Sequence, residues 1–181
     1  MLVRARQSAP IAPAALLRSA GPASQGLARV AVGDAVTRDG IDYVVDRIVS
    51  GFVDGQTSKL AHLAPSGAGE ADAWLWISPG ALELAWLHAV AAPDPGAPSI
   101  TVDDTVLRSL ESTASLVSIE STAGSAPGVL VHTWRYRADD RVAEVEQWPD
   151  GNVVAYAGKI VRPRELEIWP AAQTTKEVAR T

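Results

Sequence analysis

The chain has 181 residues, a length suited to one domain or to two small halves that share a core. It contains no cysteine, which excludes a disulfide scaffold, a thiol nucleophile, an iron–sulfur cluster and cysteine-ligated zinc. The net charge is −5, and the first 33 residues hold four arginines and no acidic residue, so the rest of the chain carries every acidic side chain. Because such an acidic body repels phosphates, nucleic acid is not expected as a partner.

Residues 1–28 are basic and rich in alanine, proline and serine. This composition favours a disordered tail. The apolar run at residues 11–17 is interrupted by Pro13 and is short for a signal peptide, and an arginine-bearing transit peptide stays an alternative. No stretch approaches the ~20 apolar residues that span a bilayer, so no integral membrane segment is expected.

Residues 29–92 are predicted to form the first of two β-rich halves. Short runs of β-branched and aromatic residues alternate with turn signals, of which Asp39-Gly40 and Asp54-Gly55 are the strongest. The expected strands cover residues 32–37, 41–49, 57–63, 73–77 and 81–90. The last of these also has the alanine and leucine content of a helix, but close turns on both sides favour a strand.

Residues 93–98 contain three prolines and are predicted to be a linker, because proline lacks a backbone donor for either regular structure. In the second half, residues 99–170, we expect a loop at 123–128 and a turn at Pro149-Asp150-Gly151. The expected strands there cover residues 99–102, 105–110, 114–120, 129–137, 141–148, 152–157 and 165–169. Residues 171–181 are expected to be a polar tail.

The whole pattern predicts an all-β fold with no long helix. About a dozen short antiparallel strands would form a barrel or a sandwich, or two similar small β-halves that share an interface.

A series of short motifs, taken in order and spacing, resembles a known family. The motifs are Gly33-Asp34-x-Val36, Asp39-Gly40, Asp42-Tyr43-Val44-Val45, Trp74-Leu75-x-Ile77, Val145-Glu146-x-Trp148, Asp150-Gly151 and Ala157-Gly158-x-x-Val161. Over about residues 30–170 the chain resembles the bacterial family described as domain of unknown function 4178. Residues 57–63 depart from the family pattern, because Lys59 and His62 stand where the family has a more acidic and aromatic strand.

The resemblance implies a protein without an assigned activity. Members of the family tend to be encoded near polyamine-synthase-like enzymes, small membrane proteins and membrane-stress proteins, which implies an accessory role in the cytoplasm. We therefore expect a non-enzymatic interaction domain that acts through a protein partner, with a membrane-associated partner as one option.

Tryptophan is over-represented, with six residues against a single phenylalanine. Trp74 and Trp76 share one strand face, because side chains alternate along a strand. If exposed, they would form a stacking platform, and if buried they would be core residues, which is the favoured interpretation. An acidic body with aromatic faces suits a polycation, so the alternative function is a binding module for a polyamine or a carbohydrate that uses Trp74, Trp76, Glu146 and Trp148.

Paired carboxylates are the first candidate for catalysis. Glu144 and Glu146 lie two residues apart on one predicted strand, roughly 6–7 Å from each other. That separation is near the one used in glycoside hydrolysis. A solvated strand face, or a cross-strand pair with Arg135 or Arg137, is the favoured interpretation.

Other catalytic arrangements have weaker signals, and an uncharacterised hydrolase is the third functional hypothesis. A triad of Ser121 or Ser125 with His132 and Asp139 lacks the glycine-flanked serine of a nucleophile elbow. No P-loop is present, and no cofactor is expected. The histidines lack ligand-like spacing, so no metal is expected: His62, His88 and His132.

Overall fold

A computed structural model describes residues 27, 29–79 and 82–171. The strands are β1 (Ala35–Arg38), β2 (Ile41–Val53), β3 (Gln56–Pro65), β4 (Ala73–Ile77), β5 (Leu84–Val90), β6 (Ser99–Val102), β7 (Thr105–Ser121), β8 (Gly124–Ala138), β9 (Arg141–Gln147), β10 (Val153–Val161) and β11 (Glu167–Trp169). A 3₁₀ turn, η3 (Pro163–Glu165), precedes β11. The predicted all-β class is confirmed, and the ambiguous segment before the linker is a strand.

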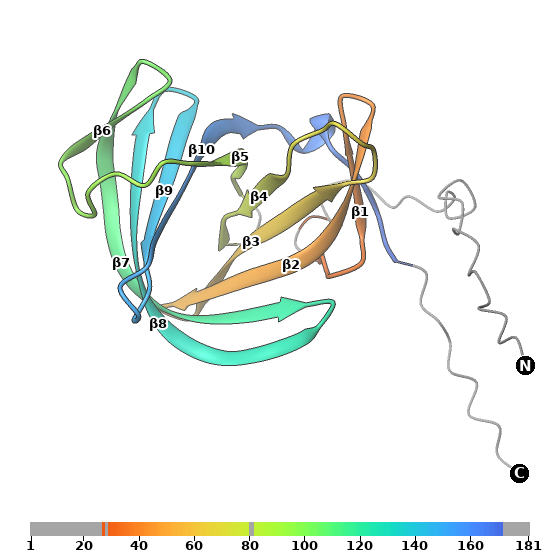
Figure 1. The fold of residues 1–181 in the computed structure, drawn as a ribbon, viewed down its shortest axis with the longest axis horizontal. Helices are drawn as coiled ribbons and strands as arrows, with labels where there is room; N and C mark the ends of the chain where they lie inside the picture. Colours follow the sequence, from red (N-terminus) through yellow and green to blue (C-terminus); the bar gives the residue numbers. More distant parts are fainter. Residues whose placement is uncertain (1–26, 28, 80–81, 172–181) are drawn as a thin grey trace, which may run out of the picture.

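Eight strands close into an antiparallel barrel in the order β2-β3-β4-β5-β10-β9-β8-β7 (Figure 1). The ring closes where β7 pairs with β2, from Phe52 opposite Leu116 to Arg47 opposite Ser121. Outside the ring, β1 and β11 extend from β2, and β6 extends from β7. Residues 29–92 and 99–170 therefore contribute to one sheet, joined at β5–β10 and at β2–β7.

Aspartates form several of the hairpin turns. Asp39 and Gly40 have φ values of 52° and 80°, and Asp54 and Gly55 have values of 50° and 78°. Positive φ at both central residues is the geometry that matches the twist of paired strands, so both predicted turns are confirmed. The turn between β6 and β7 uses Asp103 and Asp104 instead, at 46° and 61°.

The β7–β8 hairpin differs from the sequence prediction in two ways. The expected strands at 105–110 and 114–120 are one strand with a register shift between Ser109 and Glu111. The loop expected at 123–128 is wrong, because Gly124 already begins β8. The register of this hairpin shifts a second time between Val117 and Ile119, where the ladder is interrupted.

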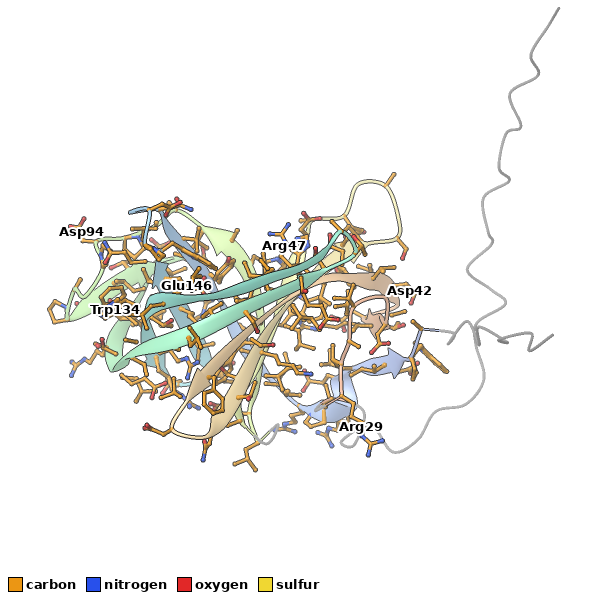
Figure 2. The ribbon with its side chains drawn as sticks, turned by 90° about the horizontal axis from the view of Figure 1, so that it is seen from below. Arg29, Asp42, Arg47, Asp94, Trp134 and Glu146 are labelled. Carbon is orange, nitrogen blue, oxygen red and sulfur yellow. The ribbon has the colours of Figure 1, made fainter. Side chains whose placement is uncertain are left out.

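Apolar side chains form three clusters, one in the barrel lumen and two on its outside. The inner cluster contains Val49, Leu60, Trp74, Trp76 and Val117 among others. One outer cluster lies beneath β1, β11 and the segment at Leu27 and Val30, and the other beneath β6. Figure 2 shows these covering segments at opposite ends, with Asp94 at one end and Arg29 and Asp42 at the other.

Burial on both faces explains why β4 reads as a continuous apolar run. All five of its residues are buried, because one face meets the lumen and the other meets the first outer cluster. Trp74 and Trp76 share the lumen face, as strand alternation predicts, and they are 8% and 9% exposed. The core interpretation of these two side chains is confirmed, and the exposed platform is wrong.

The predicted tails lie almost entirely outside the described residues. Leu27, placed in the predicted tail 1–28, is described and is buried in the outer cluster beneath β1. At the other end, the backbone N–H of Ala171 donates to Asp34 Oδ1 at 2.9 Å. Over the described ranges, no helix is long and apolar enough to cross a membrane.

Candidate functional site in the barrel lumen

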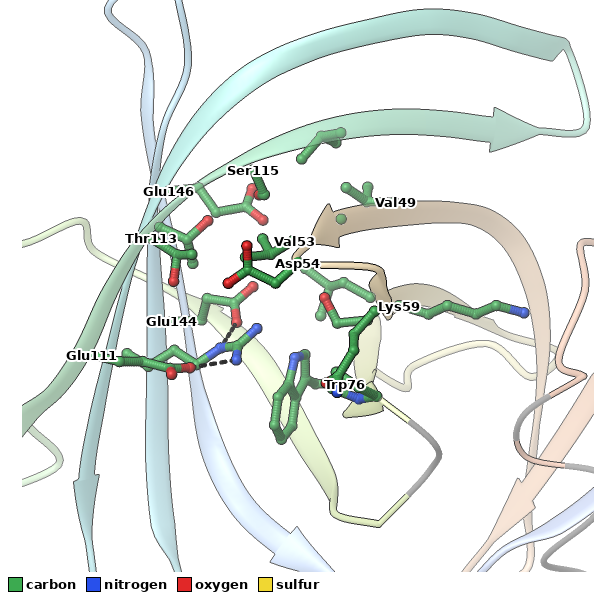
Figure 3. Close-up of a pocket in the computed structure, with 18 residues that line it drawn as sticks. Val49, Val53, Asp54, Lys59, Trp76, Glu111, Thr113, Ser115, Glu144 and Glu146 are labelled. Atoms are coloured by element: carbon green, nitrogen blue, oxygen red, sulfur yellow. Dashed lines mark hydrogen bonds and ion pairs between the residues drawn. The ribbon is translucent and has the colours of Figure 1, made fainter.

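The lumen contains a cavity of about 400 Å³ (Figure 3). Its lining comes from β2, β3, β4, β7, β8 and β9, so most of the ring contributes to it. Strand alternation selects the lining residues: Glu144 and Glu146 face the cavity, whereas Val145 between them packs in an outer cluster. The volume is that of a small-ligand site, and eight-stranded barrels commonly hold one small ligand.

The cavity wall becomes polar where the inner apolar cluster ends. Carboxyl groups outnumber cationic groups in the lining, and hydroxyl groups lie between them. The carboxyl groups are Asp54, Glu111, Glu144 and Glu146, the cations are Lys59 and Arg135, and the hydroxyls belong to Ser58, Thr113, Ser115 and Thr133. The Lys59 ammonium donates to the carbonyl of Val30 at 2.9 Å, and Arg135 pairs with two of the carboxyl groups, Glu144 and Glu111.

Arg135 is fixed by three groups. Its Nε donates to Glu144 Oε2 at 2.8 Å, and its Nη1 donates to Glu111 Oε1 at 2.6 Å. Its Cζ lies 4.6 Å from the ring centroid of Trp76, a cation–π contact. Burial alone would lower the pKa of Arg135, but the charges and hydrogen bonds of Glu144 and Glu111 raise it overall, so the guanidinium stays charged.

The register of β8 against β9 creates the pair with Glu144. Arg135 lies directly opposite Glu144, and the expected cross-strand pair is confirmed. Arg137 instead pairs with Glu83 at 2.8 Å. The solvated strand face is wrong, because Glu144 and Glu146 are only 7% and 4% exposed.

Glu146 is the more isolated of the two buried carboxyl groups. Trp148 Nε1 donates to Glu146 Oε2 at 3.2 Å. Burial raises the pKa of Glu146 to about 8, and the charge of Glu144 acts in the same direction, against smaller effects from Trp148 and Arg135. At neutral pH this carboxyl group therefore holds its proton in most molecules.

Trp76 presents a second unusual group to the lumen. Its indole Nε1 is buried and has no hydrogen-bond partner among the described residues. An unpaired buried donor costs about 1–3 kcal/mol, so a ligand or water that accepts from it would be stabilised there.

The structure brings together three of the four residues predicted to bind a ligand. Trp76 and Glu146 line the cavity, and Trp148 joins them through its hydrogen bond to Glu146. Trp74 lies apart from this cavity lining, with its ring centroid 4.7 Å from that of Tyr156 and 4.6 Å from that of His62.

The sequence did not identify Glu111 as a lining residue, and it suggested Arg135 only as a cross-strand partner of Glu144 and Glu146. One signal was present in β7, where Glu111, Thr113 and Ser115 put polar groups on the face that becomes apolar at Val117. A polar face that continues into an apolar one is the pattern of a strand that lines a partly polar lumen.

The predicted catalytic triad is not assembled. Ser125 is the second residue of β8 and Asp139 follows its last residue, so they lie at opposite ends of a long strand. Ser121 Oγ donates to the carbonyl of Gly124 within the hairpin turn. This triad is therefore wrong as a catalytic arrangement.

The histidines likewise do not converge on a metal site. His62 Nδ1 lies 2.6 Å from Asp46 Oδ1, and its Nε2 lies 3.4 Å from Asp72 Oδ2. His132 stacks on Trp134, and both residues lie on β8, whereas His62 lies on β3. Among the residues that the structure describes, no group of three or more His, Cys, Asp or Glu side chains could hold a metal ion.

Residues 31–163 match the family model described as Domain of unknown function (DUF4178). The chain belongs to this family. Comparison with curated proteins and with solved structures gave no match. The matched range contains every strand of the barrel ring and ends before β11, so the family unit includes the lumen and its lining residues.

Proposed function

We propose that the protein binds a small organic cation of the polyamine class in the lumen of its barrel. The excess of carboxyl groups that face the cavity carries this proposal. Buried carboxylates are costly unless a cation or several donors compensate them. An ammonium group supplies both the charge and the hydrogen-bond donors.

The lumen offers two positions for ammonium groups. Glu146 lies within the barrel wall, and Asp54 is exposed at the turn between β2 and β3. Figure 3 shows both carboxyl groups facing the same space. A linear diamine with one ammonium at each position would neutralise the two charges, and Ser115 and Thr133 would accept further hydrogen bonds.

A carbohydrate fits the lumen less well. Sugar recognition commonly uses an open aromatic face, but Arg135 covers the face of Trp76 and Trp74 packs against Tyr156 and His62. A neutral sugar would also give no charge compensation to Glu146 when that carboxyl group is ionised.

Titration with 1,4-diaminobutane at pH 8.5, where Glu146 is largely ionised, tests the proposal through tryptophan fluorescence and calorimetry. We expect a sub-millimolar Kd, and at least a tenfold weaker Kd in Glu146→Gln, since about 1.4 kcal/mol corresponds to a factor of ten. Glu120→Gln is the matched control because Glu120 is an exposed residue of β7. No binding by the wild-type protein at 10 mM diamine would refute the function, and tighter binding of glucose than of the diamine would favour the carbohydrate alternative.

A second candidate function is interaction with a protein partner that presents an apolar surface. Phe52, Leu116 and Leu130 are direct cross-strand neighbours on β2, β7 and β8, and they are 52%, 55% and 54% exposed. Such a continuous exposed apolar row supports an interface. We further propose, from what the family resemblance implies, that the protein acts in the cytoplasm.

Replacing the three apolar residues with threonine tests the second candidate. We expect F52T/L116T/L130T to keep the wild-type melting temperature, because the side chains are half exposed, and to lose a specific partner captured by the wild-type protein. The control V106T/L110T changes two other exposed apolar residues and should keep that partner. Equal recovery of the same proteins by the wild-type protein and both variants would count against this surface.

A further inference from the structure

We infer that Arg135 determines which cations the lumen accepts, because its guanidinium fills an inner cation site that would otherwise be open to the ligand. The choice of polyamine as ligand rests on the proposed function. The inner site itself is defined by the contacts of Arg135 and does not depend on that function.

Three walls define the inner site. The ring face of Trp76 lies 4.6 Å from Arg135 Cζ, Glu144 Oε2 lies 2.8 Å from Nε, and Glu111 Oε1 lies 2.6 Å from Nη1. An aromatic face with carboxylates around it is the arrangement by which proteins bind ammonium and guanidinium ligands. Arg135 thus occupies this site as a tethered cation.

Within the inner site, the exposure of the side chains falls from Glu111 to Arg135 to Glu144. The side chain of Glu144 is 9% exposed, that of Arg135 is 25% exposed and that of Glu111 is 47% exposed. A small cation could therefore reach the site from solvent past Glu111 if the Arg135 side chain were absent.

Arg135 also borders two cavities. The 400 Å³ cavity and a neighbouring cavity of about 240 Å³ are both lined by Trp76, Glu111, Arg135 and Glu144. The second cavity has a more apolar wall, which includes Ala85, Leu87, Leu110 and Val142. Truncating Arg135 at Cβ would join the two cavities and expose the inner site between them.

The number of carboxyl positions open to a ligand gives the specificity. Glu144 and Glu146 lie two residues apart on β9, and both face the cavity. With Arg135 present, ammonium positions remain at Glu146 and Asp54, which suits a diamine. Without Arg135, the position at Glu144 and Glu111 becomes a third, which suits a triamine.

Chemical rescue tests the inner site without any polyamine. We expect Arg135→Ala to melt at a lower temperature than the wild-type protein, and 20 mM methylguanidinium chloride to restore at least half of the loss, because a cation that binds only the folded state stabilises it. Potassium chloride at 20 mM should restore none of it. Arg141→Ala is the matched control, since Arg141 pairs with the exposed Asp103 at 3.5 Å and lines neither cavity, so methylguanidinium should have no specific effect on it.

Polyamine titration tests the specificity. For wild-type protein we expect Kd values for 1,4-diaminobutane and spermidine that agree within threefold, and for Arg135→Ala at least tenfold tighter binding of spermidine than of the diamine. If Arg135→Ala does not fold by itself, refolding it in 20 mM methylguanidinium chloride or in 20 mM potassium chloride applies the same test, with tryptophan fluorescence reporting the fold, and equal recovery in the two salts counts against the inner site.

The outcomes separate the inference from the proposed function. Equal effects of methylguanidinium and potassium on a folded Arg135 variant overturn the inner cation site. If methylguanidinium restores the melting temperature of Arg135→Ala, but this variant binds the diamine and binds spermidine no more tightly, the role of Arg135 in specificity is overturned. Absence of polyamine binding by every variant refutes the proposed function and leaves the rescue result to decide the inner site.

Discussion

Replacing Gly158 with alanine is expected to destabilise the protein by about 3 kcal/mol or more, at the upper end of overpacking effects. Gly158 lies in β10 opposite Leu87 of β5. A Cβ at this position would lie 1.9 Å from the carbonyl oxygen of Trp86 and 2.9 Å from its carbonyl carbon. Because these are backbone atoms of the neighbouring strand, no side-chain rotation can relieve the clash, and β5 and β10 must separate.

The control for this prediction is Gly67→Ala. No heavy atom lies within 4 Å of a Cβ built on Gly67, so we expect a change of no more than about 0.5 kcal/mol. Urea unfolding followed by tryptophan fluorescence measures both variants. Equal unfolding midpoints for Gly158→Ala and wild type would show that β5 and β10 do not approach each other as closely as the structure places them.

Glu146 is expected to make the protein less stable as the pH rises from about 5 to 8. The ordinary pKa of a glutamate is near 4.5, and burial beside Glu144 raises the pKa of Glu146 to about 8 in the folded protein. Between these values the unfolded chain releases the proton and the folded protein keeps it. The free energy of unfolding therefore falls with rising pH, by at most about 1.4 kcal/mol per pH unit from this group, and this contribution levels off above the folded pKa.

Glu146→Gln isolates the contribution of this carboxyl group. We expect the variant to lose the Glu146 part of the pH slope and to be more stable than wild type at pH 8 by several kcal/mol, because glutamine fills the same space without a charge. Urea midpoints at half-unit steps from pH 5 to 9 measure the slope, and Glu120→Gln on the outer face of β7 should keep the wild-type slope. A slope in Glu146→Gln equal to that of wild type would mean that Glu146 is ionised in the folded protein at neutral pH.

The features that the sequence predicted correctly are local ones. A run such as Ala73–Ile77 favours a strand through its own side chains, and an Asp-Gly pair such as Asp39-Gly40 favours a tight turn through its own backbone. The family motifs also have a structural basis. In the motif Ala157-Gly158-x-x-Val161 the glycine is needed because a Cβ at Gly158 would clash with the carbonyl of Trp86.

The loop expected at 123–128 shows where local reasoning fails. Gly124 is a turn-forming residue, yet it begins β8 because β7 offers a partner to residues 124–126. Pairing with a neighbouring strand outweighs a weak local preference, and the partner is not visible in the residues themselves.

The candidate site was predictable only in part. Tryptophan content and the proximity of Glu146 to Trp148 singled out residues that do lie at the cavity, whereas the only local sign of Glu111 was the polar strand face that it shares with Thr113 and Ser115. Glu111 reaches Arg135 from β7, and Trp76 reaches it from β4, so the site combines segments far apart in the chain.

The sequence by itself determined the strands, the aspartate turns and the family, because each depends on neighbouring residues or on motifs in order. The tertiary structure alone decided that the strands close into a ring through β2 and β7, and that the ring has two covered outer faces and a partly polar lumen. Closure also decided the state of Glu144 and Glu146, which the same alternation would leave solvated on an open sheet. Whether a side chain is buried, and whether it is charged, depends on the residues that lie across the barrel from it. Those residues are far away in the sequence, so the order of the residues does not reveal them.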